Sequence, residues 1–345
     1  MMGSVARFGG LNTKLQAIYG KMLSQDDYEN LIALDSVVEV ARYLKENTYY
    51  SDVLDEVIVE DVHRGDLEHI LKTKLIKVME SLIHFTSGPY KDFMKAMFAR
   101  YEVEDLKLIL RAITKGDDPR KIENLFLHSV DYSYLNYDLL TKSKTLNNLR
   151  DNLKGSIYQD AFRNLTEEDL SMREFHLEMN LDAIYFGNLI KKTKALSGED
   201  EAILDELIGV NIDLVNLQWV YRAKKYYGLI PEEILNYTLS GGKNFGFSKL
   251  KTIVYNDDPR SEIEASLPKK YRELLTEEDI YLERKIYQFL YERFKEFDKN
   301  SRLNISKLVA VIHFMEYEIR DIISITEAIR YEVEDIKEFL IRSFD

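Results

Sequence analysis

Long stretches of helical periodicity without breakers are the feature that most constrains the fold of this chain. Its 345 residues include only five prolines, and apolar residues recur every three or four positions instead of alternating, which predicts α-helix. One example is the helix expected from about 62 to 86. Its apolar face consists of Leu67, Leu71, Leu75, Val78 and Leu82. The sequence therefore predicts an all-α protein.

The helices are expected to pair as three helical hairpins. The predicted hairpins join 62–86 to a helix from about 90, 167–196 to 199–227, and 276–297 to 304–329. Turn residues separate the helices of each pair, namely Ser87-Gly88-Pro89, Ser197-Gly198 and 298–301. Shorter helices are predicted at 27–34, 36–46, 145–153 and 231–239. Because no linker rich in Gly, Ser or Pro divides the chain, these elements are expected to pack as one body.

The hexapeptide RYEVED occurs twice, at 100–105 and 330–335. A true repeat should fall at a constant distance from the turn of its hairpin. Asp105 lies 17 residues after Gly88, whereas Asp335 lies 35 residues after the third turn at Asn300. The second copy of the hexapeptide is therefore out of register with the repeat.

Positions in register are Asp105, Asn216 and Asp321, which lie 17, 18 and 21 residues after their turns. Each is preceded three residues earlier by an acid and is followed by an aliphatic residue. Intervals of 111 and 105 residues indicate duplicated domains rather than a short-period solenoid. The predicted repeat units are 1–117, 118–229 and 230–345.

Apolar residues beside these positions form a packing stripe. In the first unit the stripe consists of Val103, Leu106, Leu110 and Ile113, and in the third of Ile319, Ile322 and Ile329. Asp105, Asn216 and Asp321 lie beside it, where a side-chain oxygen could accept a hydrogen bond from a neighbouring helix end. We therefore interpret the recurring pattern as a core-facing seam.

Composition excludes several classes of function. The chain has 47 basic and 60 acidic residues, and its net charge of −13 disfavours nucleic acid and anionic lipid as partners. Without cysteine it has no disulfides, thiolate metal sites or cysteine nucleophiles. No run of 18 apolar residues predicts a membrane span, and the first ten residues lack the apolar core of a secretion signal. We expect a cytoplasmic protein.

No motif for catalysis, cofactor binding or metal binding is complete. The six histidines are scattered, and each is expected to be structural. The segment SGGKNFG at 240–246 lacks the first glycine and the hydroxyl of a phosphate loop, so we interpret it as the glycine stop of helix 231–239. DKNSRLNISKLV from Asp298 lacks the glycine and the glutamate of a calcium loop. We predict no catalytic, cofactor-binding or metal-binding residue.

Several segments together resemble the C subunit of the V-type and archaeal-type rotary ATPases, the counterpart of the d subunit in the vacuolar enzyme. The segments are FGGLNTKLQAIYGKMLSQDDYENLIAL, YEVEDLKLILRA, NIDLVNLQWVYRAKKYYGLIPEEIL, TLSGGKNF and EYEIRDIISITEAIRYEVEDIKEFL. Their order and spacing cover nearly the whole chain. One departure is that Asp105 and Asp321 stand where family members often have Asn, and both residue types accept hydrogen bonds.

This resemblance implies a non-catalytic central-stalk subunit. Three like domains would form a pseudo-threefold funnel between the central axle subunits, of the D and F type, and the membrane proteolipid ring. The protein would transmit torque during ATP-driven proton or sodium transport or ATP synthesis, on the cytoplasmic face of the membrane. The resemblance implies no cofactor, no small-molecule substrate and no spanning segment.

Two other interpretations remain open at this point. A helical scaffold or adaptor unrelated to rotary ATPases would stack its units openly, with two free ends. An enzyme on a helical fold would need titratable groups converging in a pocket, and nucleotide hydrolysis by the isolated chain would support it.

Overall fold

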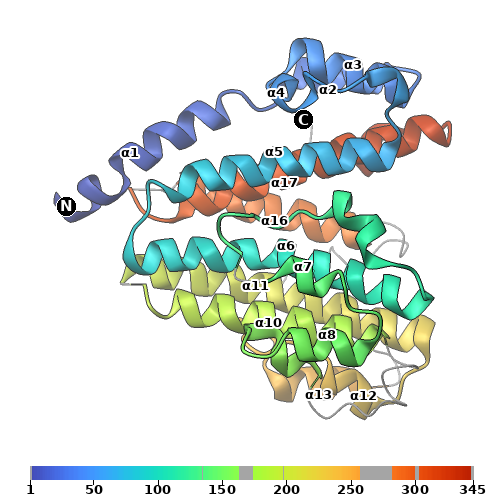
Figure 1. The fold of residues 1–345 in the computed structure, drawn as a ribbon. Coiled ribbons are helices and arrows are strands. Elements are labelled where there is room, and N and C mark those ends of the chain that lie inside the picture. Colours follow the sequence, from blue (N-terminus) through green and yellow to red (C-terminus); the bar gives the residue numbers. More distant parts are fainter. Residues whose placement is uncertain are drawn as a thin grey trace. The chain divides into compact units, whose positions relative to one another are not determined.

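The computed structural model describes residues 2–133, 135–162, 174–196, 198–256, 282–299 and 303–342. Every regular element in these ranges is a helix (Figure 1), which confirms the all-α prediction. The chain divides into two compact units. Unit 1 comprises residues 1–86, 198–207 and 263–345, and unit 2 comprises 87–197 and 208–262. The three repeat units predicted along the sequence remain a prediction.

Unit 1 is built around α17 (Ser306–Arg330), which is buried on most sides. The elements packed against it are α1 (Met2–Tyr19), α2 (Gln25–Ile32), α3 (Val37–Asn47), α5 (Arg64–Ile83), α16 (Leu282–Lys299) and η7 (Ile336–Phe339). Figure 1 shows α5 and α17 running side by side. The short helices α4 (Ser51–Leu54) and η1 (Val59–Asp61) complete the N-terminal part. The first turns of α11 (Glu199–Arg222) also belong to this unit.

Unit 2 is built around α6 (Gly88–Lys115) and α10 (Glu174–Thr193), which pack along each other. Its other elements are η2 (Pro119–Leu125), α7 (Tyr137–Leu140), α8 (Leu146–Asn152), η3 (Ile157–Phe162), the later turns of α11, η4 (Ala223–Tyr227), α12 (Pro231–Asn236) and α13 (Phe247–Tyr255). The predicted stripe Val103, Leu106, Leu110 and Ile113 is buried here in a core with residues of α8, η3 and α10. On its rim, Lys107 binds Asp182 at 2.6 Å and Arg111 binds Glu178 through two bonds of 2.7 and 2.9 Å.

Local sequence signals begin and end these helices. The Ser24 hydroxyl accepts from the Asp27 amide while the Asp27 carboxylate accepts from the Ser24 amide, so both ends of this capping box are made. Pro89 occupies the first turn of α6, where its missing N–H costs nothing, and Gly116 ends that helix with a left-handed φ of 78°. The turn predicted at 87–89 overlaps the break between α5 and α6 only at Ser87, because the break runs over 84–87 and Gly88 and Pro89 already belong to α6.

Some predicted boundaries differ from the structure. The helix predicted at 199–227 is α-helical only to Arg222 and continues as the π-helical turn η4, which Gly228 ends. The helix predicted at 231–239 ends at Asn236, before Gly241 and Gly242, so the interpretation of these glycines as its stop is wrong. The starts predicted near 167 and 276, together with Ser197 and residues 300–302 of the calcium-like segment, lie outside the described residues.

Candidate functional site

Three long helices each carry a pair of buried polar side chains spaced three residues apart. The pairs are Glu102 and Asp105 on α6, Asp213 and Asn216 on α11, and Glu318 and Asp321 on α17. No member is more than 8% exposed. Because residues three apart lie on one face of a helix, both members of a pair point to the same side of their helix.

The second member of each pair in unit 2 binds the backbone just beyond a short helix. Asp105 accepts from the amides of Leu127 at 2.8 Å and His128 at 3.0 Å, shortly after η2. Asn216 accepts from the Leu239 amide at 2.7 Å and donates to the Leu239 carbonyl at 2.8 Å, shortly after α12. These bonds satisfy backbone N–H and C=O groups that have no hydrogen-bond partner within a helix.

Asp321 makes the corresponding contact in unit 1. It accepts from the amides of Ile341 at 2.6 Å and Arg342 at 3.1 Å, shortly after η7. The out-of-register copy of RYEVED at 330–335 leads into the short helix η7. It therefore corresponds to the residues that lead into η2 after α6 and into α12 after α11. The predicted acceptor role of Asp105, Asn216 and Asp321 is thus confirmed at all three positions.

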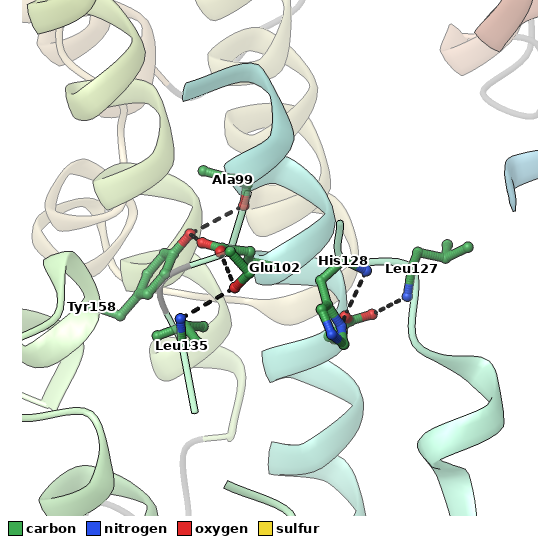
Figure 2. A network of polar contacts seen from close by, with 8 residues as sticks. Ala99, Glu102, Leu127, His128, Leu135 and Tyr158 are labelled. Carbon is green, nitrogen blue, oxygen red and sulfur yellow. Dashed lines mark hydrogen bonds and ion pairs between the residues drawn. The ribbon is translucent and has the colours of Figure 1, made fainter. Parts of the chain in front are cut away.

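On α6, the first member of the pair binds side chains from a later segment. The Tyr158 hydroxyl donates to Glu102 at 2.7 Å, and the Ser133 hydroxyl donates to its other oxygen. Figure 2 shows the network, with Tyr158 beside Glu102 and the amides of Leu127 and His128 directed at the second carboxylate. A charged acceptor strengthens each of these bonds.

On α11, Asp213 holds the glycine-containing loop against the helix. It accepts from the amides of Asn244 at 2.7 Å and Phe245 at 3.0 Å, and from the Asn244 side chain at 2.9 Å. A Cβ on Gly242 would lie 2.3 Å from an Asp213 oxygen. The SGGKNFG segment therefore needs glycine so that its backbone can approach α11 closely. Burial raises the pKa of Asp213, and the hydrogen bonds from the loop oppose this.

On α17, the first member binds the N-terminal part of the chain. Glu318 accepts from the Leu23 amide at 2.7 Å and from the hydroxyls of Tyr49 at 2.7 Å and Tyr50 at 2.9 Å. Burial raises the pKa of Glu318 to about 7 and that of Asp321 also to about 7, although their hydrogen bonds favour the ionised forms. This pair therefore titrates close to neutral pH.

The three pairs anchor loop backbone and side chains to long helices, and we call this arrangement the fastening device. Each carboxylate or amide is occupied by donors from its own unit, which ties irregular backbone to a long helix. Among the described residues, no group of three or more His, Asp or Glu side chains could hold a metal ion. His128 is itself part of the network, since its ring nitrogen lies 2.8 Å from Asp105.

Sequence reasoning missed the role of Glu102, Asp213 and Glu318. The signal was present, because an acid stands three residues before each of the acceptors that were identified. Their hydroxyl and backbone partners lie between 31 and 295 residues away along the chain. No local periodicity reports contacts over such distances.

Comparisons with known proteins agree with the resemblance. The family model described as ATP synthase (C/AC39) subunit matches residues 11–339. A relative from Methanosarcina mazei, named as the C subunit of an A-type ATP synthase, is 24% identical over 246 residues, 71% of this chain and 66% of the relative. Relatives of the same name from Pyrococcus abyssi and Methanocaldococcus jannaschii are 22% and 23% identical, with 95% and 99% of this chain and 89% and 87% of theirs covered. The matched region is thus just under two thirds of the first relative and most of the other two.

Proposed function

The chain belongs to the ATP synthase (C/AC39) subunit family, and on that premise we propose that it is the non-catalytic central-stalk subunit of an archaeal-type or V-type rotary ATPase. In this role it couples the central axle to the membrane proteolipid ring and turns with both. Its neighbours would be axle subunits of the D and F type on one side and the ring on the other. The complex would pump protons or sodium, or make ATP, with this chain on the cytoplasmic face.

The observation that carries the proposal is the recurrence of one fastening device on α6, α11 and α17, together with the family match over most of the chain. Three copies support three like units, arranged as a funnel around a pseudo-threefold axis. The bounds 1–117, 118–229 and 230–345 stay a prediction, because the device joins residues across them, Asp105 to Leu127 and Asn216 to Leu239. A torque-transmitting body must lose little rotation to internal bending. Buried bonds that tie loops to long helices serve this need, because each loop then moves with its helix.

Buried carboxylates are also the strongest argument for a role without catalysis. Asp105 and Asp213 accept hydrogen bonds from backbone amides. A backbone amide N–H can only donate, whereas a hydroxyl can both donate and accept. A general acid or base must instead reach a substrate proton. ATP and the transported ion would therefore be handled by other subunits. No helix among the described residues is long and apolar enough to cross a membrane.

The proposal is tested by removing the chain from a purified rotary ATPase and measuring hydrolysis and transport separately. We expect the catalytic head to keep hydrolysing ATP, while ATP-driven ion accumulation in vesicles is lost. Adding back the wild-type chain should restore accumulation. Unimpaired accumulation without the chain, or recovery of the tagged chain from membranes with neither axle nor ring subunits, would contradict the proposal.

A further inference from the structure

The N-terminal segment 23–50 occupies on α17 the place that residues 133–158 occupy on α6. In both cases a tyrosine hydroxyl donates to the glutamate of the buried pair, Tyr50 to Glu318 at 2.9 Å and Tyr158 to Glu102 at 2.7 Å. Both segments therefore approach the first member of a pair with the same kind of residue.

The two segments also share their internal order. Ser36 caps α3 and Thr145 caps α8, each accepting from the amide three residues later at 3.2 Å. Tyr28 and Tyr137 each stand eight residues before these caps, and the tyrosines that bind glutamate stand 14 and 13 residues after them. The difference is that 133–158 follows its helix directly, whereas 23–50 reaches α17 from almost 300 residues away.

We propose that residues 23–50 are a clasp that closes the α17 unit and that the clasp is proton-linked, docking more tightly when the Glu318 and Asp321 pair is protonated. The clasp contacts both carboxylates. Leu23, Tyr49 and Tyr50 donate to Glu318, and the Tyr28 hydroxyl lies 3.3 Å from Asp321. This inference rests on unit 1 alone and does not depend on the proposed role in a rotary ATPase.

Burial gives the direction of the linkage. With residues 23–50 in place, Glu318 and Asp321 are 3% and 1% exposed, and burial disfavours their ionised forms. Both pKa values are raised to about 7 in the docked state, from ordinary values of 4.5 and 3.8. A group whose pKa is raised by docking stabilises the docked state below its ordinary pKa, and this stabilisation is lost as pH rises through the docked value. The clasp should therefore loosen between about pH 4.5 and 7.

The hydrogen bonds around Glu318 and Asp321 allow their carboxylates to be protonated. A protonated Glu318 could donate from the oxygen shared by Tyr49 and Tyr50, because a hydroxyl also accepts. Its other oxygen would still accept from the Leu23 amide. At Asp321 each oxygen accepts from a backbone amide, Oδ1 from Ile341 and Oδ2 from Arg342, and the Tyr28 hydroxyl lies 3.3 Å from Oδ2, where it could accept the proton of a protonated carboxyl. Protonation thus leaves the clasp contacts in place.

The other charged and titratable groups around the pair lie on several elements of unit 1. Arg342 is the one cation among the described residues that line the adjoining pocket of about 220 Å³, and its guanidinium donates to the Leu23 carbonyl and lies over the Tyr28 ring. From α16 and α17 the pocket is lined by Tyr291 and Tyr317. From α1 it is lined by Tyr19, and from α5 Lys74 lies 5.4 Å from the Tyr49 ring centre. Arg342 opposes the rise in the Glu318 pKa, but burial outweighs it.

Hydrogen exchange on the full chain tests the proposal. Protection factors for peptides within 23–50, corrected for the intrinsic pH dependence of exchange, are measured at pH 5.5 and pH 7.5. Each proton released from a group with a docked pKa of about 7 should raise the opening equilibrium about 20-fold between these pH values, so 20-fold is the rise expected if one of the two groups titrates. Peptides of α6 and α10 serve as the reference for global opening.

Two variants separate proton linkage from simple destabilisation. The double variant Glu318→Gln, Asp321→Asn removes both titrating groups and is patterned on α11, where Asn216 already fills the second position. It should abolish the pH dependence in 23–50, whereas the matched control Glu102→Gln should retain it. Equal protection at both pH values in the wild type would overturn the proposal, as would an unchanged pH dependence in the double variant. If the double variant does not fold, the wild-type comparison decides.

Discussion

Replacing Asp105 by alanine is the sharpest test of the fastening device. The side chain is fully buried and holds the amides of Leu127 at 2.8 Å and His128 at 3.0 Å. Alanine would leave both amides without their acceptor, and each buried unsatisfied group costs about 1–3 kcal/mol. We therefore expect the free energy of unfolding of unit 2 to fall by about 2–5 kcal/mol, near the upper end of single substitutions.

The chain has its own reporter for this measurement. Trp219 is the single tryptophan, it is buried, and it lies in the part of α11 that belongs to unit 2. Urea unfolding followed by its fluorescence gives the stability of that unit. Asp105→Asn is the matched control, because it keeps one acceptor oxygen for the two amides, so its loss should be smaller than that of alanine. A loss below about 0.5 kcal/mol for Asp105→Ala, the range of ordinary surface changes, would refute the reasoning.

Two further substitutions test the remaining contacts by the same assay. Tyr158→Phe removes the hydroxyl that donates to Glu102 and should cost about 1.5–3 kcal/mol, the range for a hydrogen bond to a charged group; a loss of only a few tenths would mean that this bond contributes little. Gly242→Ala should destabilise unit 2, because its Cβ would meet Asp213 at 2.3 Å. Gly187→Ala, on an exposed helical position of α10 with open space around it, should instead stabilise by about 0.5–1 kcal/mol, and equal effects of the two alanines would contradict the close-approach explanation.

Much of the fold could be predicted because helical periodicity is a local signal. The helix predicted at 62–86 is α5, from Arg64 to Ile83, and the one predicted at 304–329 is α17, from Ser306 to Arg330. The acceptor positions were predictable from similar distances of 17, 18 and 21 residues after each turn. These distances identified Asp105, Asn216 and Asp321, and all three bind backbone.

The end of α11 shows where local reasoning fails. At the end of α11 the Leu229 amide donates to the Ala223 carbonyl, six residues back. At the end of α6 the Asp117 amide donates to the Ala112 carbonyl, five residues back. One extra residue is accommodated as the π-helical turn η4. The residue types here are ordinary helix formers, so composition does not distinguish a π-helical turn from a continuing α-helix.

Contacts over long sequence distances could not be predicted at all. Nothing in the sequence near Leu23 or Tyr50 indicates that they bind Glu318, because a pairing across almost 300 residues produces no periodic pattern. The interpretation of Gly242 as the stop of a helix was wrong for a related reason. A glycine needed for close approach to another helix has the same local appearance as a glycine that ends one.

Covalent attachment tests the rotor assignment most directly. Because the chain has no cysteine, single cysteines at exposed positions can be paired with one cysteine in a neighbouring protein of the assembled complex. If this chain turns with the proteolipid ring, a disulfide between the two should leave ATP-driven ion transport intact, whereas a disulfide to a stationary part of the complex should stop transport until it is reduced. Loss of transport on attachment to the ring would contradict the assignment.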